Sequence, residues 1–350
     1  MRTKNLSTLL AFLLITALVC TSFIGCSRGG GSSGGGGGGT TAEDPIIIKW
    51  AHTDTEAKSN SVAALEFKEY MESKTNGRVI VEVYPNAQLG DDEEILKGIK
   101  LGTIEIYAGQ GVTGMVAGEQ ANLSELPFVY TSYEDWRIGT FEKGGIDIFN
   151  KMLEGTGLVC VDFQYAGAKH ILSSKGFYKE LGDLSGFKVR VTPTDLNIAI
   201  WQALGANPTP ISYGEVYTAL SQGVVDGIEH SLGILLDGKF YESCKYLTLT
   251  NHTFSPYVII SNAKFVDSLP ADIREIFDAG IKHVGDAQRI KEVAQQEQYV
   301  QDLIDFGCEV YVMEEHVLEQ MKAAMESVYE YQAKASGRDT IDAWLATGGN

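Results

Sequence analysis

The sequence predicts an α/β fold in two lobes, and three features of its pattern support that prediction. Strand-like and helix-like segments alternate through residues 45–109, and the same alternation returns in residues 187–230. Alternation at this spacing is typical of βαβ units and a mainly parallel sheet. A helical pattern then runs through residues 270–306, and an unbroken helix of that length would reach both lobes.

The first lobe is expected to contain strands with alternating apolar residues and amphipathic helices between them. Asn76-Gly77 ends the first of these helices, and acidic residues in the first turn of the second are favoured by the helix dipole. The expected elements are a strand and loop at 45–54, a helix at 59–77, a strand at 78–86, a helix at 91–102 and a strand at 103–109.

The second lobe repeats the pattern, and glycine ends each of its helices. Ser212 and Glu215 have the spacing of a capping box, which predicts the start of the second helix. The expected elements are a strand at 187–191, a helix at 194–205, a short strand at 208–211 and a helix at 212–223.

The last third of the chain is mainly helical. Within the helical pattern at 270–306, Gly280 and Gly285 are the places where a break is expected if there is one. A short strand at 308–313 and a C-terminal helix from Glu314 onward complete the expected elements.

The N-terminus has the features of an export signal. Arg2 and Lys4 precede an apolar core at 6–19, which is short for a membrane-spanning helix. The core leads to "FIGC", and Cys26 resembles the lipidated cysteine of a bacterial lipobox, although Phe23 departs from the usual Leu. The Gly- and Ser-rich segment that follows is typical of a flexible tether. We expect a lipid-anchored, extracytoplasmic protein; the alternatives are an uncleaved anchor or plain secretion.

Composition excludes several classes of function. The net charge of −18 argues against a nucleic-acid partner. The His residues are scattered singly, and no catalytic, nucleotide-binding or metal-binding motif is present, so we expect no enzyme activity, no cofactor and no metal. The three cysteines beyond the leader, Cys160, Cys244 and Cys308, are interpreted as buried thiols.

The polar side chains at the ends of strands are those of a binding protein. Open α/β sheets bind ligands in the crevice beyond the carboxyl ends of their strands. Arg190 alternates with Val189 and Val191, so it shares a strand face with Lys188. Arg190 either points into a cavity to meet an anion or is a solvated surface charge beside Lys188.

Two stretches resemble a known family. The solute-binding proteins of tripartite ATP-independent periplasmic (TRAP) transporters are similar to "VYPNAQLGDDEEILKGIKLGTIEI" and to "LSGFKVRVTPTDLNIAIWQALGANPTPISYGEVYTALSQGVVDGIEH". The resemblance extends from about Ile46 to the C-terminus. It implies a periplasmic-binding-protein-like fold in which two α/β lobes are joined by two crossing strands and a long helix. It also implies that the lobes close on a small organic acid, which a permease driven by an ion gradient then takes up.

The resemblance also implies ligand-binding residues. The family Arg that pairs with a ligand carboxylate falls on Arg190, which favours the cavity over the surface. A second family Arg falls on Lys169, which keeps the positive charge but lacks the planar pair of NH donors of a guanidinium. The aromatic residue that packs on the ligand falls on Tyr213, and a polar pocket residue falls on Gln110. For Lys169 the alternative is a place on the rim of the site, and for Tyr213 it is a place in the hydrophobic core.

Three further positions complete the expected site. An Asn that is frequent in the family is replaced here by His230, which keeps a hydrogen-bonding group but makes it titratable. Tyr257 and Thr53 are expected to contribute polar groups. Because of these departures we do not infer the ligand of this protein from the ligands of family members. As the ligand, a sugar acid such as a uronate is preferred to an aromatic acid.

The expected division of the chain follows from these features. It comprises a lipoprotein signal peptide at 1–25, the lipidated Cys26 and tether at 26–44, a first lobe at 45–167 plus about 256–297, and a second lobe at 168–255 plus about 298–350. Two other functions stay open. One is a lipoprotein enzyme that acts on small carboxylates, and the other is the ligand-sensing subunit of a signalling system.

Overall fold

The computed structural model describes residues 44–349, which belong to one compact unit. The expected signal peptide, Cys26 and tether lie outside the described residues. Between residues 44 and 349, no helix is both long and apolar enough to cross a membrane.

Two sheets organise the described chain, and in each of them one strand runs against the others. The first sheet has the order β2-β1-β3-β10-β4, and only β10 is antiparallel to its neighbours. Its strands are β1 (Ile46–Ala51), β2 (Val79–Tyr84), β3 (Ile106–Gln110), β4 (Leu158–Gln164) and β10 (Tyr257–Asn262).

The second sheet has the order β11-β9-β5-β8-β6-β7, and here β5 is the antiparallel strand. Arg190 of β6 lies opposite Ile228 of β8 in its register. Its strands are β5 (Lys169–Ser173), β6 (Lys188–Val191), β7 (Asn207–Pro210), β8 (Gly227–Ser231), β9 (Tyr246–Leu249) and β11 (Glu309–Val312).

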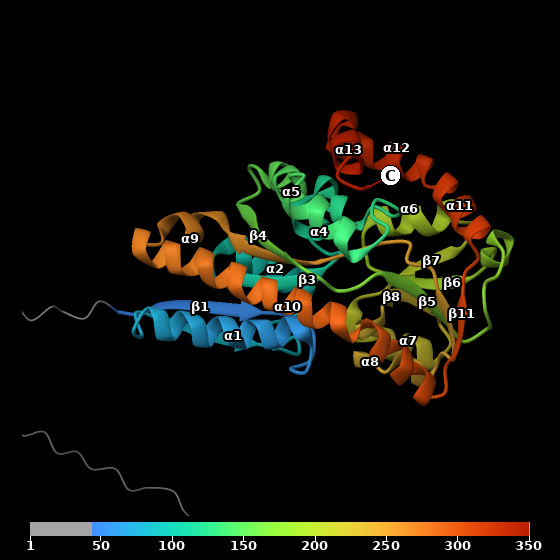
Figure 1. The fold of residues 1–350 in the computed structure, drawn as a ribbon, viewed down its shortest axis with the longest axis horizontal. Helices are drawn as coiled ribbons and strands as arrows, with labels where there is room; N and C mark the ends of the chain where they lie inside the picture. The colour runs from blue at the N-terminus through green and yellow to red at the C-terminus, as the bar shows by residue number, and fades with distance from the viewer. Residues whose placement is uncertain (1–43, 350) are drawn as a thin grey trace, which may run out of the picture. The chain divides into compact units, whose positions relative to one another are not determined.

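Helices follow most strands and cover the sheets (Figure 1). In the first part of the chain they are α1 (Ser59–Lys74), α2 (Asp92–Leu101), α3 (Gly114–Ala117), α4 (Tyr133–Phe141), α5 (Gly145–Leu153), α6 (Asp195–Ala203), α7 (Val216–Ser221) and α8 (Leu232–Asp237). In the last part they are α9 (Ala263–Ser268), α10 (Ala271–Asp305), α11 (Glu315–Ala324), α12 (Glu326–Ser336) and α13 (Arg338–Leu345). Single 3₁₀ turns occur at Glu119–Glu125, Leu181–Leu184, Tyr213–Glu215 and Phe240–Glu242.

Helix capping differs from the expectation. The Ser212 side chain makes no capping hydrogen bond, so the predicted capping box is wrong. Instead, the Glu215 amide donates to the Ser212 carbonyl at 3.0 Å, which makes a 3₁₀ turn before α7. A complete capping box begins α2, where the amides of Glu94 and Asp91 donate to each other's side chains at 2.9 and 3.0 Å.

The prediction of two lobes with a long helix is confirmed. The chain passes from the first sheet to the second between β4 and β5, and returns between β9 and β10. Helix α10 packs on α1 and β4, which belong to the first lobe, and then on α8, which follows β8 in the second (Figure 1). It is unbroken over Ala271–Asp305.

The glycines inside α10 allow close approach to neighbouring elements. A Cβ added at Gly280 would lie 3.1 Å from the Phe67 ring on α1, and one at Gly285 would lie 1.9 Å from Asp162 Oδ2 on β4. Asp162 accepts hydrogen bonds from Arg289 at 3.0 Å, so Gly285 makes room for a buried ion pair. These contacts explain why glycine is present in a continuous helix despite its low helix propensity.

The C-terminal helix expected from Glu314 consists of three shorter helices. Helix α12 contacts α6 and the 3₁₀ turn Glu119–Glu125, while α13 contacts α5. The three cysteines are free and buried, as expected.

Candidate ligand-binding site

A pocket is lined by residues from both sheets and from the loops that follow their strands. It therefore lies where open α/β sheets bind ligands. Six of the residues singled out in the sequence line it: Thr53, Gln110, Arg190, Tyr213, His230 and Tyr257.

Arg190 is a buried cation in the wall of this pocket. Its side chain is 2 % exposed, whereas Lys188 on the same strand is exposed, so the surface alternative for Arg190 is wrong. Nε donates to the carbonyl of Ile211 at 2.9 Å, and the guanidinium forms no ion pair with residues 44–349. Burial lowers the pKa of Arg190 to about 10, so the group is charged at neutral pH. Its terminal NH groups are donors suited to an anion in the pocket.

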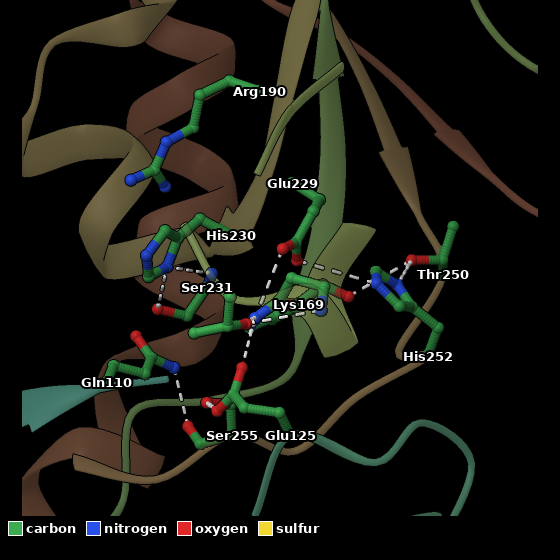
Figure 2. Close-up of polar contacts among 12 residues, drawn as sticks. Gln110, Glu125, Lys169, Arg190, Glu229, His230, Ser231, Thr250, His252 and Ser255 are labelled. Atoms are coloured by element: carbon green, nitrogen blue, oxygen red, sulfur yellow. Dashed lines mark hydrogen bonds and ion pairs between the residues drawn. The ribbon is translucent and has the colours of Figure 1, made fainter. Parts of the chain in front are cut away.

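His230 adds a neutral donor beside Arg190 (Figure 2). Its Nδ1 accepts a hydrogen bond from the backbone amide of Ser231 at 3.0 Å, so the ring proton resides on Nε2. Burial, together with Lys169 and Arg190, lowers the pKa of His230 well below its usual value. The ring therefore stays neutral near pH 7, and Nε2–H is its remaining hydrogen-bonding group.

Several neutral groups in the pocket need partners. The Tyr257 hydroxyl and Gln110 Oε1 are buried and have no hydrogen-bond partner among the described residues, while Gln110 Nε2 donates to the Ser255 carbonyl at 2.6 Å. Buried polar atoms in native proteins are nearly always paired, so these atoms are candidates for ligand contacts. Tyr213 lines the same pocket and also packs edge-on against Phe240.

Sequence reasoning missed four acidic residues in the lining, Asp54, Asp91, Asp92 and Glu93. Asp92 accepts hydrogen bonds from the hydroxyls of Tyr107 at 2.7 Å and Thr53 at 3.0 Å. Burial raises the pKa of the Asp54 and Asp92 carboxyls, that of Asp54 to about 7. One feature of the sequence indicated that Asp54 belongs to the site, because it directly follows Thr53 in the loop at the end of β1. The acids of α2 were interpreted only through the helix dipole.

Lys169 is not among the residues that line the pocket. Its Nζ lies 2.7 Å from Glu125 Oε2 and 3.3 Å from Glu229 Oε1, between the two carboxylates (Figure 2). Burial would raise the pKa of Glu229, but Lys169 and His252 outweigh it and lower the value to about 2. The Lys169 ammonium is therefore neutralised within the protein, in contrast to Arg190. A direct contact between Lys169 and a ligand stays a prediction.

The main binding groups of the pocket are largely shielded from bulk water, since Arg190 and Tyr257 are 2 % exposed and His230 is 6 % exposed. Thr55, in the loop after β1, donates to Asp237 at the end of α8 and thereby links the two lobes beside the pocket.

The comparison with protein families agrees with this architecture. The model of the bacterial extracellular solute-binding proteins of family 7, DctP, matches residues 50–335. The chain belongs to the TRAP solute-binding proteins. A curated relative, the C4-dicarboxylate-binding periplasmic protein DctP of Rhodobacter capsulatus, is 31% identical over 305 residues, which are 86% of this chain and 90% of that protein.

Solved structures of TRAP solute-binding proteins have the same fold. One from Sulfitobacter sp. NAS-14.1, with bound β-D-galacturonate, has a TM-score of 0.80 and 26% identity, over 85% of this chain and 99% of that chain. Another from Sulfurospirillum deleyianum, with bound succinate, has a TM-score of 0.79 and 28% identity, over 87% and 100% of the two chains. Similar TRAP proteins therefore bind ligands of two chemical types.

Proposed function

We propose that this TRAP solute-binding protein captures a small organic acid through a pair between the ligand carboxylate and Arg190, and delivers it to an ion-gradient-driven permease. One observation carries the proposal: a buried, charged guanidinium lines the pocket and forms no ion pair with residues 44–349. A bidentate carboxylate is the partner that suits its fork of donors.

The polar groups of the site account for a large part of the binding energy needed to capture a dilute solute. A micromolar dissociation constant corresponds to about 8 kcal/mol. A charge-assisted pair contributes about 1.5–3 kcal/mol and each neutral hydrogen bond about 1 kcal/mol. Arg190 together with His230, Tyr257 and Gln110 can therefore supply much of this total, and Tyr213 adds an aromatic surface for packing.

The preferred ligand is a hydroxylated acid such as a sugar acid. The relatives do not decide this, because one is a C4-dicarboxylate-binding protein and the compared structures hold galacturonate and succinate. The pocket itself favours hydroxyl groups, because its lining has no Lys or second Arg beside Arg190, and its other polar groups are neutral hydrogen-bonding groups and carboxylates.

Ligand binding would shift the protein towards closure. In the closed geometry, an unpaired charge on Arg190 is unfavourable by about 3–5 kcal/mol. In the open state water solvates the same group. A ligand carboxylate removes the penalty and thereby shifts the population to the closed form that the permease receives. No step in this cycle makes or breaks a covalent bond.

The N-terminal part would hold the protein at the membrane. We retain the proposal that cleavage before Cys26 and lipidation of its thiol anchor the chain, with residues 26–44 as tether. The lobe boundaries at about residues 167, 255 and 297 belong to the same proposal. Mass spectrometry of the exported protein tests it through a diacylglycerol adduct on Cys26, which Cys26→Ser should abolish.

Calorimetry with a panel of acids tests the function. Thermal-shift screening with galacturonate, glucuronate, galactonate and succinate should find at least one stabilising ligand, whose dissociation constant is then measured. Arg190→Ala should weaken binding at least a hundredfold, whereas the exposed Lys188→Ala on the same strand should leave it unchanged. Unchanged affinity of Arg190→Ala would contradict the proposal, as would conversion of the acid to a product.

A further inference from the structure

Asp54 is a buried carboxylate in the pocket wall, on the loop that follows β1. It is 6 % exposed, and its Oδ2 accepts a hydrogen bond from Asn60 Nδ2 at 2.9 Å. Asn60 is fully buried in the first turn of α1, so its amide fixes the orientation of the carboxylate. Among the described residues no group donates to Oδ1, although Asp54 lines the pocket.

The surroundings of Asp54 do not neutralise it. Lys58 is the cation that acts on it most strongly, but the two residues form no ion pair within the described part of the chain. Asp92 and Asp237 add negative charge to its environment. The charged or titratable groups that face it are Lys58 before α1, Asp92 on α2, Tyr213 before α7, Asp237 on α8 and Tyr257 on β10.

The pocket therefore has two ends of opposite character. Arg190 and the Nε2–H of His230 are donors suited to a carboxylate. Asp54 lies among the aromatic residues, and it is the group whose negative charge acts most strongly on the hydroxyls of Tyr213 and Tyr257. A single small ligand in this pocket would meet both ends.

We propose that Asp54 is a specificity-determining residue that accepts a hydrogen bond from a donor group of the ligand and excludes a second carboxylate. The inference rests on the proposed pair between the ligand carboxylate and Arg190. It assigns the ligand to monocarboxylates that carry hydroxyl or ammonium groups, and it separates this protein from dicarboxylate binders.

Charge complementarity is the physical reason for this selection. A second carboxylate placed beside Asp54 would meet a like charge in the pocket wall, and such contacts strongly disfavour the wrong partner. A hydroxyl or ammonium group would instead satisfy the free oxygen of Asp54. Burial raises the pKa of Asp54 to about 7, because it outweighs the lowering effects of Lys58 and of the hydrogen bond from Asn60.

The test compares selectivity in the purified protein and in Asp54→Asn. Asn keeps the size of the side chain and removes the charge. Isothermal calorimetry should give a dissociation constant for galacturonate at least tenfold lower than for succinate in the unchanged protein. In Asp54→Asn the galacturonate constant should rise at least tenfold while the succinate constant stays the same or falls. Asp339→Asn, an exposed position on α13, removes a carboxylate elsewhere and should change neither value.

A second ligand series distinguishes the two kinds of donor. Galactonate and erythronate carry hydroxyl groups and no ammonium group, whereas alanine and valine carry an ammonium group beside the carboxylate and no hydroxyl group. The series whose affinity falls in Asp54→Asn identifies the donor that Asp54 accepts. The melting temperature of each variant shows that the fold is intact, and Asp54→Ser is the replacement variant if Asp54→Asn does not fold.

The outcomes separate this inference from the proposed function. If Arg190→Ala abolishes binding but Asp54→Asn leaves the ratio of the two constants unchanged, the role of Asp54 is wrong and the carboxylate pair stands. If the unchanged protein prefers succinate, the role of Asp54 is also wrong. If no acid binds, or if Arg190→Ala binds normally, the proposed function itself fails.

Discussion

Replacing Arg190 by Met should close the ligand-free protein while abolishing ligand binding. Met is unbranched and flexible, so it can fill the space of the Arg stem without its charge. In the closed geometry the guanidinium is 2 % exposed and forms no ion pair with residues 44–349. When the lobes separate, water solvates the guanidinium, so its charge favours the open state. Removing the charge removes this bias.

The expected change in the ratio of closed to open protein follows from the structure. Burial lowers the pKa of Arg190 from 12.5 to about 10 in the closed geometry. A change of that size corresponds to about 3 kcal/mol of lost stabilisation of the charged form. Met also loses the hydrogen bond from Nε to Ile211, but this contact lies within the second lobe, so its loss affects the open and closed forms alike. A difference of about 3 kcal/mol raises the ratio of closed to open protein roughly 150-fold.

Small-angle X-ray scattering of the ligand-free proteins measures this ratio. Arg190→Met should have a smaller radius of gyration than the unchanged protein, and a spin-label pair at the exposed Lys74 and Gln222 should report a shorter distance. Arg190→Lys keeps a charge and should stay open. If Arg190→Met is as open as the unchanged protein, the buried charge does not hold the lobes apart, and the reasoning is refuted.

Three further predictions concern other contacts. Because the pKa of Asp54 is raised to about 7 and its carboxylate is the acceptor, ligand affinity should be highest above pH 7 and fall about tenfold from pH 8 to pH 6, as calorimetry would show. Thr55→Ala breaks the hydrogen bond to Asp237 that links the lobes, so stopped-flow release of ligand should be about five- to tenfold faster, with a smaller change in association. Gly285→Ala places a Cβ 1.9 Å from Asp162 Oδ2, so urea unfolding should show a loss of about 3 kcal/mol.

Each of these predictions has a matched control. Asp54→Asn should make ligand affinity independent of pH between 6 and 8, and a persistent slope would assign the titration to another group. Thr55→Ser keeps the hydroxyl and should restore slow release. Gly182→Ala adds a Cβ with no neighbour within 4 Å and should change stability by less than about 0.5 kcal/mol. Equal losses in Gly182→Ala and Gly285→Ala would show that close packing at Gly285 is not the cause.

Periodic patterns in the sequence predicted the strands β1, β2, β3, β6, β7 and β11 and the helices α1, α2, α6 and α7, but not the strands β4, β5, β9 and β10. Helix α10 was foreseen because apolar residues recur along its whole length, and contacts with α1 and β4 explain its glycines. The C-terminal helix was predicted as one and proved to be three, because the turns between them contain no proline and only one glycine, Gly337. The capping box at Ser212 failed because a 3₁₀ turn satisfies the same amide through the backbone.

The alternation of residues on the strand did not by itself decide the position of Arg190, because it placed Arg190 on the same face as the exposed Lys188. The family resemblance favoured the cavity, and Arg190 does line the pocket. Lys169 could not be placed, because its partners Glu125 and Glu229 are 44 and 60 residues away in the sequence. Asp54 could not, because a carboxylate in a strand-end loop is usually solvated, and only the tertiary fold buries it.

The comparison of Lys169 with Arg190 shows what makes a buried cation a binding group. Both side chains come from the second sheet and both are nearly inaccessible to water. Lys169 is held by two carboxylates of the protein, so an external anion would have to displace one of them and leave it buried without a partner. Between residues 44 and 349, Arg190 donates from Nε to a backbone carbonyl and forms no ion pair, although Glu229 and Asp92 lie near enough to favour its charged form. An external carboxylate would therefore pair with the guanidinium without displacing a partner. This absence of an ion pair, more than the charge itself, is the property that suits Arg190 to bind a solute.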